Sequence, residues 1–351
     1  MSQTKAQLLD TLIASLLPAS DSSVDIGSNG VRFANGYFDT LYGDGSNLTG
    51  VTSTTINSNA DNRVITGSGT ANTLNGESNL LFDGSILTVD GVNVGKGANS
   101  VLNNTVLGRS ALDAAVTGNH NTAIGKTALT TNTSGANNTA VGANSLVLNT
   151  TASDNTGLGF QALQDNSTGA SNTAVGANSL SNNTTGSTNT GVGKDALKAS
   201  TTADNNTAVG HDALTLNTTG TNNTAIGANA GDAITTGNNN TAIGKDALTD
   251  VTTGVDNTGC GVAALFDNTT GVHNAGFGKD ALRENVSGNY NTAVGSSAMN
   301  SCGNGSNNVA VGYSSLFNNT GANNIAIGYE SMRANTTGTM NVAVGASTLD
   351  A

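Results

Sequence analysis

Residues 172–188, NTAVGANSLSNNTTGST, contain the pattern that decides the fold of this chain. The pattern Asn-Thr-Ala-(Val/Ile)-Gly-x-x-(Ala/Ser)-Leu, followed by Asn-rich turn residues, recurs from Asn104 to the end of the sequence. Its glycines are Gly108, Gly125, Gly142, Gly159, Gly176, Gly193, Gly210, Gly227, Gly244, Gly261, Gly278, Gly295, Gly312, Gly328 and Gly345. The step is 17 residues except between Gly312 and Gly328, where the turn is one residue shorter. Fifteen copies in register indicate an all-β parallel solenoid (a β-roll or β-helix) in which each repeat forms one rung.

Each repeat has room for two short strands and two turns. In the segment Thr-Ala-Val-Gly, alternate side chains point to opposite faces, so Ala and Gly form a small face and Thr and Val a larger one. Turn segments such as NTTG at 217–220 combine Asn and Gly, which tolerate left-handed backbone conformations. Stacked rungs place identical residues about 4.8 Å apart. We therefore expect ladders of Asn and Thr side chains along the rod.

A coil this small encloses a thin core, and fifteen rungs give a rod of about 70 Å. A second apolar ladder, which includes Leu112, Leu129 and Leu146, is expected to remain partly exposed on a single chain. Packing against two identical chains would bury it. The sequence therefore predicts a parallel homotrimer.

The composition argues against an ordinary enzyme. The chain has 351 residues, 46 glycines, one proline, no tryptophan, seven phenylalanines and five tyrosines, too few bulky side chains to fill globular cores of that total size. Disordered chains are usually rich in proline and charge, and both are scarce here. The formal charge of -12 disfavours nucleic acid and anionic membrane as partners. No apolar run is long enough to span a bilayer, so membrane insertion is not expected.

The N-terminal hundred residues differ from the repeats and suggest three segments. Residues 1–20 contain an amphipathic helix over 2–17, expected to dock on another protein or on sister helices, although it could instead fold back on its own chain. Its apolar stripe consists of Leu8, Leu9, Leu12, Ile13, Leu16 and Leu17. Asp10 interrupts the apolar run, which disfavours a signal peptide. Residues 21–60 form an aromatic-rich β module for attachment, 61–100 a β-rich connector, and 101–351 the solenoid shaft.

The 17-residue repeat resembles repeats of phage tail-fibre proteins and is similar to the head repeats of trimeric autotransporter adhesins, which share a strand of the form Asn-x-x-(Val/Ile)-Gly. Residues 25–50 and 62–80 also resemble segments of phage structural proteins. The resemblance implies a structural fibre fixed to tail or capsid and projecting toward the host surface. A bacterial trimeric surface adhesin, located extracellularly, is the alternative. The sequence ends in mid-repeat, so we expect either a removed C-terminal part or a capping protein.

Candidate catalytic and metal sites are weak, and we expect neither cofactor nor metal. Gly125-Lys126-Thr127 resembles the end of a phosphate loop, but His120 stands where such a loop needs glycine. Asp195 and Asp212 could form a carboxylate pair for glycoside cleavage. However, acidic residues recur at this position in several repeats, and the sequence predicts no cleft beside them. The histidines lie at different positions of the repeat and predict no metal cluster. Cys260 and Cys302 also differ in position, so free thiols are expected.

Two features predict binding. The strand threonines, such as Thr173 and Thr207, occupy the same position in successive repeats and suggest ice binding as a less favoured function. In a fibre, we expect their hydroxyls to form hydrogen bonds within the rod. Most aromatics of the repeats lie between 266 and 329, which suggests contact with a host-surface glycan. The candidate receptor contacts are Phe277, Tyr290, Tyr313 and Tyr329. The alternative is that these rings fill irregular rungs.

Overall fold

The fold is described from a computed structural model of the chain, which places residues 63–67, 74–82, 86–97 and 101–349. The chain divides into two units, Met1–Thr55 and Ile56–Ala351, and all described residues belong to the second. The predicted helix over 2–17 and the module over 21–60 lie outside the described residues. Within the described ranges the chain consists of strands and turns, without a helix.

Four antiparallel strands precede the repeats: β1 (Arg63–Gly67), β2 (Leu74–Phe82), β3 (Ile86–Val89) and β4 (Val92–Gly95). Each pairs with the next along the chain. Strand β4 then pairs antiparallel with the first strand of the repeats, with Val94 opposite Leu107. The hydrogen-bonding edge of the first rung is therefore covered by the chain itself.

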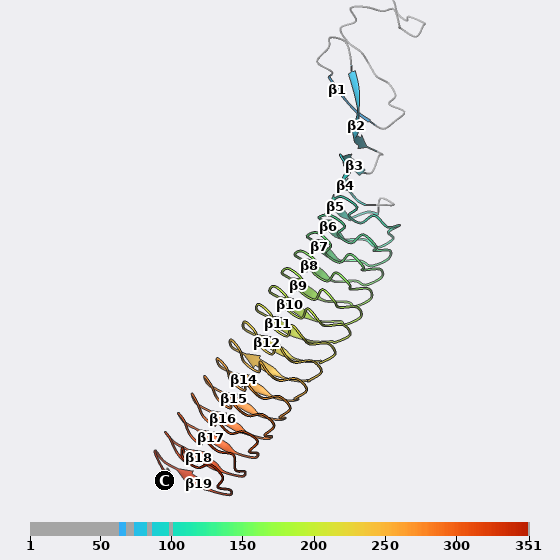
Figure 1. The fold of residues 1–351 in the computed structure, drawn as a ribbon. Coiled ribbons are helices and arrows are strands. Elements are labelled where there is room, and N and C mark those ends of the chain that lie inside the picture. Colours follow the sequence, from blue (N-terminus) through green and yellow to red (C-terminus); the bar gives the residue numbers. More distant parts are fainter. Residues whose placement is uncertain (1–62, 68–73, 83–85, 98–100, 350–351) are drawn as a thin grey trace, which may run out of the picture. The chain divides into compact units, whose positions relative to one another are not determined.

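Fifteen parallel strands follow, and each pairs with its neighbour in the sequence (Figure 1). They are β5 (Thr105–Gly108), β6 (Thr122–Ile124), β7 (Thr139–Val141), β8 (Thr156–Leu158), β9 (Thr173–Val175), β10 (Thr190–Val192), β11 (Thr207–Val209), β12 (Thr224–Ile226), β13 (Thr241–Ile243), β14 (Thr258–Cys260), β15 (Ala275–Phe277), β16 (Thr292–Val294), β17 (Val309–Val311), β18 (Ile325–Ile327) and β19 (Val342–Val344). The register is one repeat per rung, as in Thr190 opposite Thr207. The predicted parallel β-solenoid with 17-residue turns is confirmed.

The repeat glycines after each strand form a column because the rungs leave no room for a side chain there. Gly125 has a φ of +127°, and a Cβ built on it would lie 2.6 Å from the carbonyl oxygen of Gly142 in the next rung. Such an approach is closer than van der Waals contact allows, and the positive φ is itself costly for other residues. Glycine is thus required both by the backbone conformation and by stacking.

The core of the coil is built from the small face of the strands and from the leucine column. Ala174 of β9 and Leu180 of the same rung both have no exposed surface. The leucine column was expected to remain partly exposed on one chain, and this prediction is wrong: Leu112, Leu129, Leu146, Leu163 and Leu197 are also fully buried within their own coil. The leucines adopt left-handed backbone conformations, with a φ of 52° at Leu180, and these turn the side chains inward.

Three rungs lack this leucine: Met299 and Met332 replace it in two of them, and the third has no side chain at that position and compensates for it. Gly231 occupies the leucine position, and the next buried position of that rung holds Ile234 instead of Asn. A Cβ built on Gly231 would lie 3.0 Å from Cδ1 of Ile234 and 3.2 Å from Cδ2 of Leu214. The isoleucine therefore fills the space that leucine occupies in most other rungs, which maintains the dense packing that protein interiors require.

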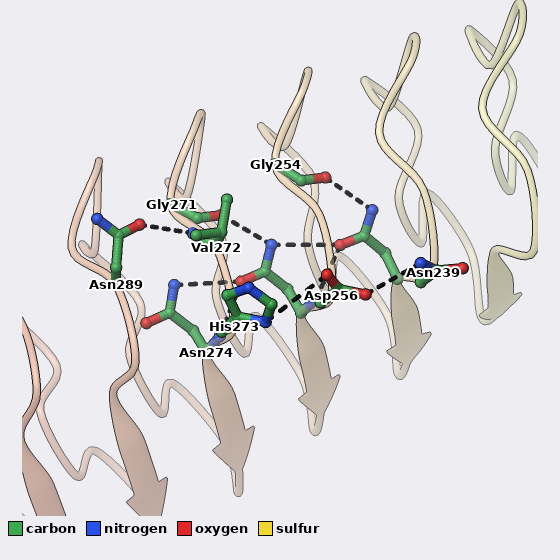
Figure 2. Close-up of polar contacts among 10 residues, drawn as sticks. Asn239, Gly254, Asp256, Gly271, Val272, His273, Asn274 and Asn289 are labelled. Atoms are coloured by element: carbon green, nitrogen blue, oxygen red, sulfur yellow. Dashed lines mark hydrogen bonds and ion pairs between the residues drawn. The ribbon is translucent and has the colours of Figure 1, made fainter.

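A buried asparagine begins each rung, just before the strand, and links it to both neighbours. Asn257 accepts a hydrogen bond from the backbone N–H of Asn274 at 3.0 Å, and its amide donates to the carbonyl oxygen of Gly271 at 2.8 Å. Figure 2 shows this ladder near Asn274. The same Asn-to-Asn bond occurs at every step from Asn104 to Asn341. The predicted asparagine ladder is confirmed.

A threonine ladder also forms, but in a turn and not on the strands. The hydroxyl of Thr184 donates to the carbonyl oxygen of Thr201 at 3.0 Å, and that of Thr201 donates to Thr218 at 3.2 Å. The acceptor is main-chain oxygen and not the equivalent hydroxyl. The strand threonines, by contrast, make no side-chain hydrogen bond within the described residues, so the expectation that they bond within the rod is wrong for the single chain.

Candidate interaction surfaces

The strand face is a regular surface of the solenoid, and it consists of the outward side chains at the first and third positions of β5–β19. The first position is usually Thr and is half-buried, while the third is usually Val or Ile. Leu158, Ile226 and Phe277 at the third position are 45%, 42% and 43% exposed. Neither position carries a charged residue in any of the fifteen strands.

The strand face becomes wholly apolar near the C-terminal end. Val309 replaces threonine in β17, and Ile325 and Val342 replace it in the next two strands. Val342 and Val344 of β19 are 65% and 67% exposed. Monomeric soluble proteins rarely present large continuous apolar patches, which usually mark surfaces that contact another molecule.

The C-terminal aromatic patch consists of Tyr313, Tyr329, Phe317, Glu330 and Arg333. The rings of Tyr313 and Tyr329, at one position of adjacent rungs, stack with centroids 5.5 Å apart and an interplanar angle of 16°. Arg333 Nη1 lies 3.5 Å from Glu330 Oε1, and its guanidinium carbon lies 5.9 Å from the centroid of the Phe317 ring. Both tyrosines are about half exposed (51% and 55%).

The other two predicted receptor contacts lie on different columns. Tyr290 stacks on His273, with centroids 4.9 Å apart, and His273 Nδ1 lies 3.6 Å from Asp256 Oδ2. Asn239 extends this exposed row by donating to Asp256 Oδ1 at 3.0 Å (Figure 2). Phe277 lies on the strand face. The structure therefore brings two of the four rings together and separates the others.

The phosphate-loop-like segment forms an ordinary corner of a rung. Thr127 donates its hydroxyl hydrogen to Asn144 Oδ1 at 2.6 Å, and Lys126 is exposed. The backbone N–H of Gly125 donates to the carbonyl oxygen of Leu107 at 2.8 Å. The groups that would hold a phosphate are thus directed to neighbouring rungs.

Asp195 is held in its ionised form. Burial alone would raise the pKa of its carboxyl, but hydrogen bonds from Lys194, Asn178 and Lys198, with the charge of Lys198, lower it to about 2. A carboxyl with such a pKa remains deprotonated near neutral pH and is a poor general acid. Its two lysine partners, Lys194 and Lys198, belong to the same rung, so these two contacts are local.

A group of carboxylates lies on the turn opposite the strand face. Asp250, Asp267 and Glu284 line an open depression of about 620 Å³. Burial raises the pKa of Asp267, and the neighbouring charge of Asp250 raises it further. Burial also raises the pKa of Asp232 to about 6. Among the described residues, no three His, Cys, Asp or Glu side chains are placed to hold a metal ion.

Both cysteines are free thiols, as the sequence predicts. Cys260 occupies the third position of β14 and thus lies on the strand face. Cys302 is buried in the core, and burial raises the pKa of its thiol to about 12. Only Cys260 is therefore accessible to reagents.

Comparisons with protein families, curated proteins and solved structures find no match for the chain. In the described ranges, no helix has the length and apolarity needed to cross a membrane. Sequence reasoning identified Tyr313 and Tyr329 as contacts, placed Phe317 only within the aromatic-rich region, and missed Glu330 and Arg333. Their positions in the repeat could have revealed the group, because Arg333 follows Phe317 at the same position in the next rung.

Proposed function

We propose that three copies of the chain pack in parallel through the strand face, and that the resulting fibre is a structural component of a phage virion. The observation that supports this most is an uncharged, partly exposed column over fifteen rungs, which consists of Val, Ile and Leu side chains except at Cys260 and Phe277. Burying such surface yields roughly 25 cal/mol per Å². A parallel, in-register arrangement about a threefold axis places identical columns against one another at every rung.

The reason for association differs from the one that the sequence suggested. The leucine column needs no partner because each coil buries its own. The exposed Val/Ile column and the half-buried strand threonines, whose hydroxyls have no partner in the described part of the chain, form the surface left to cover. In a trimer, these hydroxyls could bond to the neighbouring copies, which would satisfy polar groups at the interface.

Ice binding is a weaker explanation of the strand face. A surface that orders water needs a regular array of hydroxyls over its whole length. Here Ala275 interrupts the threonine column, Phe277 projects from the same strand, and the last three strands carry only Val or Ile at both outward positions. These changes weaken a water-ordering array and improve a protein interface.

The virion role is supported by the resemblance of the repeat and of residues 25–50 to phage structural proteins. In this proposal, the leucine stripe of residues 8–17 docks on a tail or capsid protein, and the solenoid projects outward without enzymatic activity. Its partners are its own copies, other virion proteins and a host-surface glycan. A bacterial surface adhesin remains the alternative location for the same rod.

Cys260 provides a direct test of the assembly. We expect light scattering to give the mass of a trimer, and a short bis-maleimide to link copies of a Cys302→Ser variant into dimers through Cys260. The matched control adds Cys260→Ser and Asn182→Cys, which moves the thiol to an exposed turn away from the strand face; we expect little linkage. A monomeric mass, or equal linkage in both variants, would refute the interface.

The location is tested separately on native particles. A gold label at the N-terminus is expected at the junction between a fibre and the particle. A Leu12→Asp/Ile13→Asp variant should still form trimers but be absent from purified particles. Incorporation of this variant at the normal level would contradict docking through the leucine stripe, and labelling of bacterial surfaces in place of particles would favour the adhesin.

A further inference from the structure

The C-terminal aromatic patch has the features of a ligand-binding surface, beginning with two exposed ring faces. Tyr313 and Tyr329 stack on each other, and their neighbours in the same column are Ser296 and Ala346. These small side chains cannot cover a ring. The outer face of each tyrosine is thus open to a flat apolar partner.

The backbone under the rings is fixed by the ladder. The N–H of Glu330 donates to the carbonyl oxygen of Tyr313 at 2.9 Å, and the N–H of Ser347 donates to that of Tyr329 at 2.8 Å. Both tyrosines therefore project from rungs that are hydrogen-bonded to each other. Tyrosine has few rotatable bonds, so little conformational entropy is lost when such a surface binds a ligand.

Polar side chains follow Tyr329 closely in the sequence and contact each other. Glu330 follows Tyr329 directly and lies 3.5 Å from Arg333, which lies over the ring of Phe317. The side chain of Arg333 is 50% exposed and that of Glu330 21% exposed. The carboxylate can accept hydrogen bonds and the guanidinium can donate several. Because their charges cancel, the patch has no net charge.

This combination selects one class of ligand. An aromatic face is electron-rich and attracts polarised C–H groups, while the adjacent Glu–Arg pair suits hydroxyl groups. A pyranose presents both, with C–H bonds on one face and hydroxyls at the rim. Polyanions such as nucleic acid are disfavoured by the chain's charge of -12 and by the pairing of the one arginine in the patch.

We propose that the C-terminal aromatic patch binds a neutral hexopyranose glycan, with a sugar ring stacked on Tyr313 or Tyr329 and its hydroxyls bonded to Glu330 and Arg333. The idea that this glycan belongs to a host surface rests on the proposed fibre function, whereas the binding does not. Three copies in a trimer would present three patches, and their weak contacts would combine through effective concentration.

The test uses the full chain and a printed array of neutral, amino and acidic oligosaccharides. We expect binding to neutral glycans and at least a tenfold loss of affinity in Tyr313→Ala and Tyr329→Ala, which corresponds to about 1.4 kcal/mol. Tyr329→Phe should keep most of the affinity, since it keeps the ring. If an alanine variant is unstable, this variant still tests whether the ring or the hydroxyl is needed for binding. Glu330→Gln should weaken binding by removing the stronger acceptor.

Phe160 offers a matched control. It occupies the same position of the repeat as the two tyrosines, is 52% exposed, and has no stacked aromatic neighbour in the described residues. Phe160→Ala should leave glycan binding unchanged. Equal losses in this variant and in Tyr329→Ala would overturn the assignment of the site.

Other outcomes also overturn the proposal. These are no binding to any neutral glycan, binding to acidic glycans alone, or capture of a surface component that resists periodate and is lost on proteolysis, which would identify a protein partner. Light scattering on the same samples separates the two proposals. A trimer that binds no glycan refutes this inference alone, and a monomer that binds neutral glycans refutes the proposed assembly alone.

Discussion

Two columns of buried asparagines run through the solenoid, and they differ in continuity. The continuous column begins each rung and holds Asn in every one from Asn104 to Asn341. The interrupted column lies three residues after the leucine position and holds Asn in most rungs, but the replacements are Ala115, Ser200, Ile234, Val251 and Cys302. Both columns are buried in most rungs, so burial alone does not explain why only one tolerates other residues.

The difference lies in what each asparagine bonds. In the continuous column, Asn206 Oδ1 accepts from the backbone N–H of Asn223 at 2.9 Å, and its amide donates to the carbonyl oxygen of Gly220 at 2.8 Å. In the interrupted column, Asn166 donates to Asn149 Oδ1 at 3.1 Å and to Gly169 at 2.9 Å. The first column thus serves a backbone donor that has no other acceptor, whereas the second serves another side chain and its own turn.

Interruptions in the second column leave buried polar atoms without hydrogen-bond partners. Asn183 Oδ1, Ser200 Oγ and Asn217 Oδ1 are buried and have no hydrogen-bond partner among the described residues. Asn183 precedes Ser200, and Asn217 precedes Ile234, so each loses the amide that would donate to it. The comparison indicates that an asparagine bonded to another side chain can be replaced with a modest loss of stability. An asparagine that satisfies a backbone N–H is harder to replace.

The largest expected effect comes from replacing one asparagine in each column of the same rung. Asn206→Leu should lower the free energy of unfolding by about 1–3 kcal/mol, because it leaves the buried N–H of Asn223 unpaired. The carbonyl oxygen of Gly220 keeps the amide of Asn217 as a donor at 3.0 Å. Asn217→Leu should cost clearly less, because Asn217 Oδ1 already lacks a partner and the neighbouring rungs hold Ile234 and Val251. Urea unfolding followed by circular dichroism measures both.

Equal losses in Asn206→Leu and Asn217→Leu would remove the distinction between the columns. A repeat protein can unfold in steps, so the comparison should use the same spectroscopic signal and check that the slope with urea is unchanged.

A smaller, opposite effect is expected from repairing the interrupted column. Ser200→Asn should raise the free energy of unfolding by about 1–2 kcal/mol, because the new amide can donate to Asn183 Oδ1. Ala203 in that rung should permit the change, since Asn149 already lies in a rung with Ala152 at the same position and donates to its carbonyl oxygen at 3.0 Å. Thr202→Asn, on an exposed turn, is the control and should be neutral; destabilisation by Ser200→Asn would mean that the gap is not simply a missing donor.

The smallest expected effect depends on pH and concerns the rung of Ile234. Burial raises the pKa of Asp232 from 3.8 to about 6, with further contributions from Asp250 and Asp246, while backbone hydrogen bonds oppose the shift. The folded chain therefore binds this proton more tightly than the unfolded chain, and the stability gained in acid is lost as the pH rises from about 4 to 6. Asp232→Asn should raise the melting temperature at pH 7.

That gain should shrink toward zero as the pH falls to about 4, because wild-type Asp232 is then neutral. Melting temperatures of both proteins across this range test the prediction. Asp113→Asn, at the equivalent but exposed position of an early rung, is the control. A gain at Asp232 that does not vary with pH would point to better hydrogen bonding and not to relief of a buried charge.

Sequence reasoning failed where backbone conformation changed the direction of a side chain. Strand alternation predicted that Ala174 and Val175 lie on opposite faces, and this prediction is confirmed, because Ala174 is buried and Val175 is half-buried. Leu180 was misplaced because a left-handed residue does not follow that alternation. The aromatic patch was predicted only in part, because Arg333 lies over Phe317 of the previous rung and pairs with Glu330. These contacts appear only once the rungs are stacked.

The sequence by itself determined the period, the glycine column and the asparagine ladder, because a repeat that stacks in register must satisfy the same steric and hydrogen-bonding conditions in every rung. Only the tertiary structure decided which apolar column the chain buries alone and which it leaves at the surface. That choice depends on how the backbone closes each coil, and the left-handed leucines direct the largest apolar side chains into the coil and leave the Val/Ile column outside.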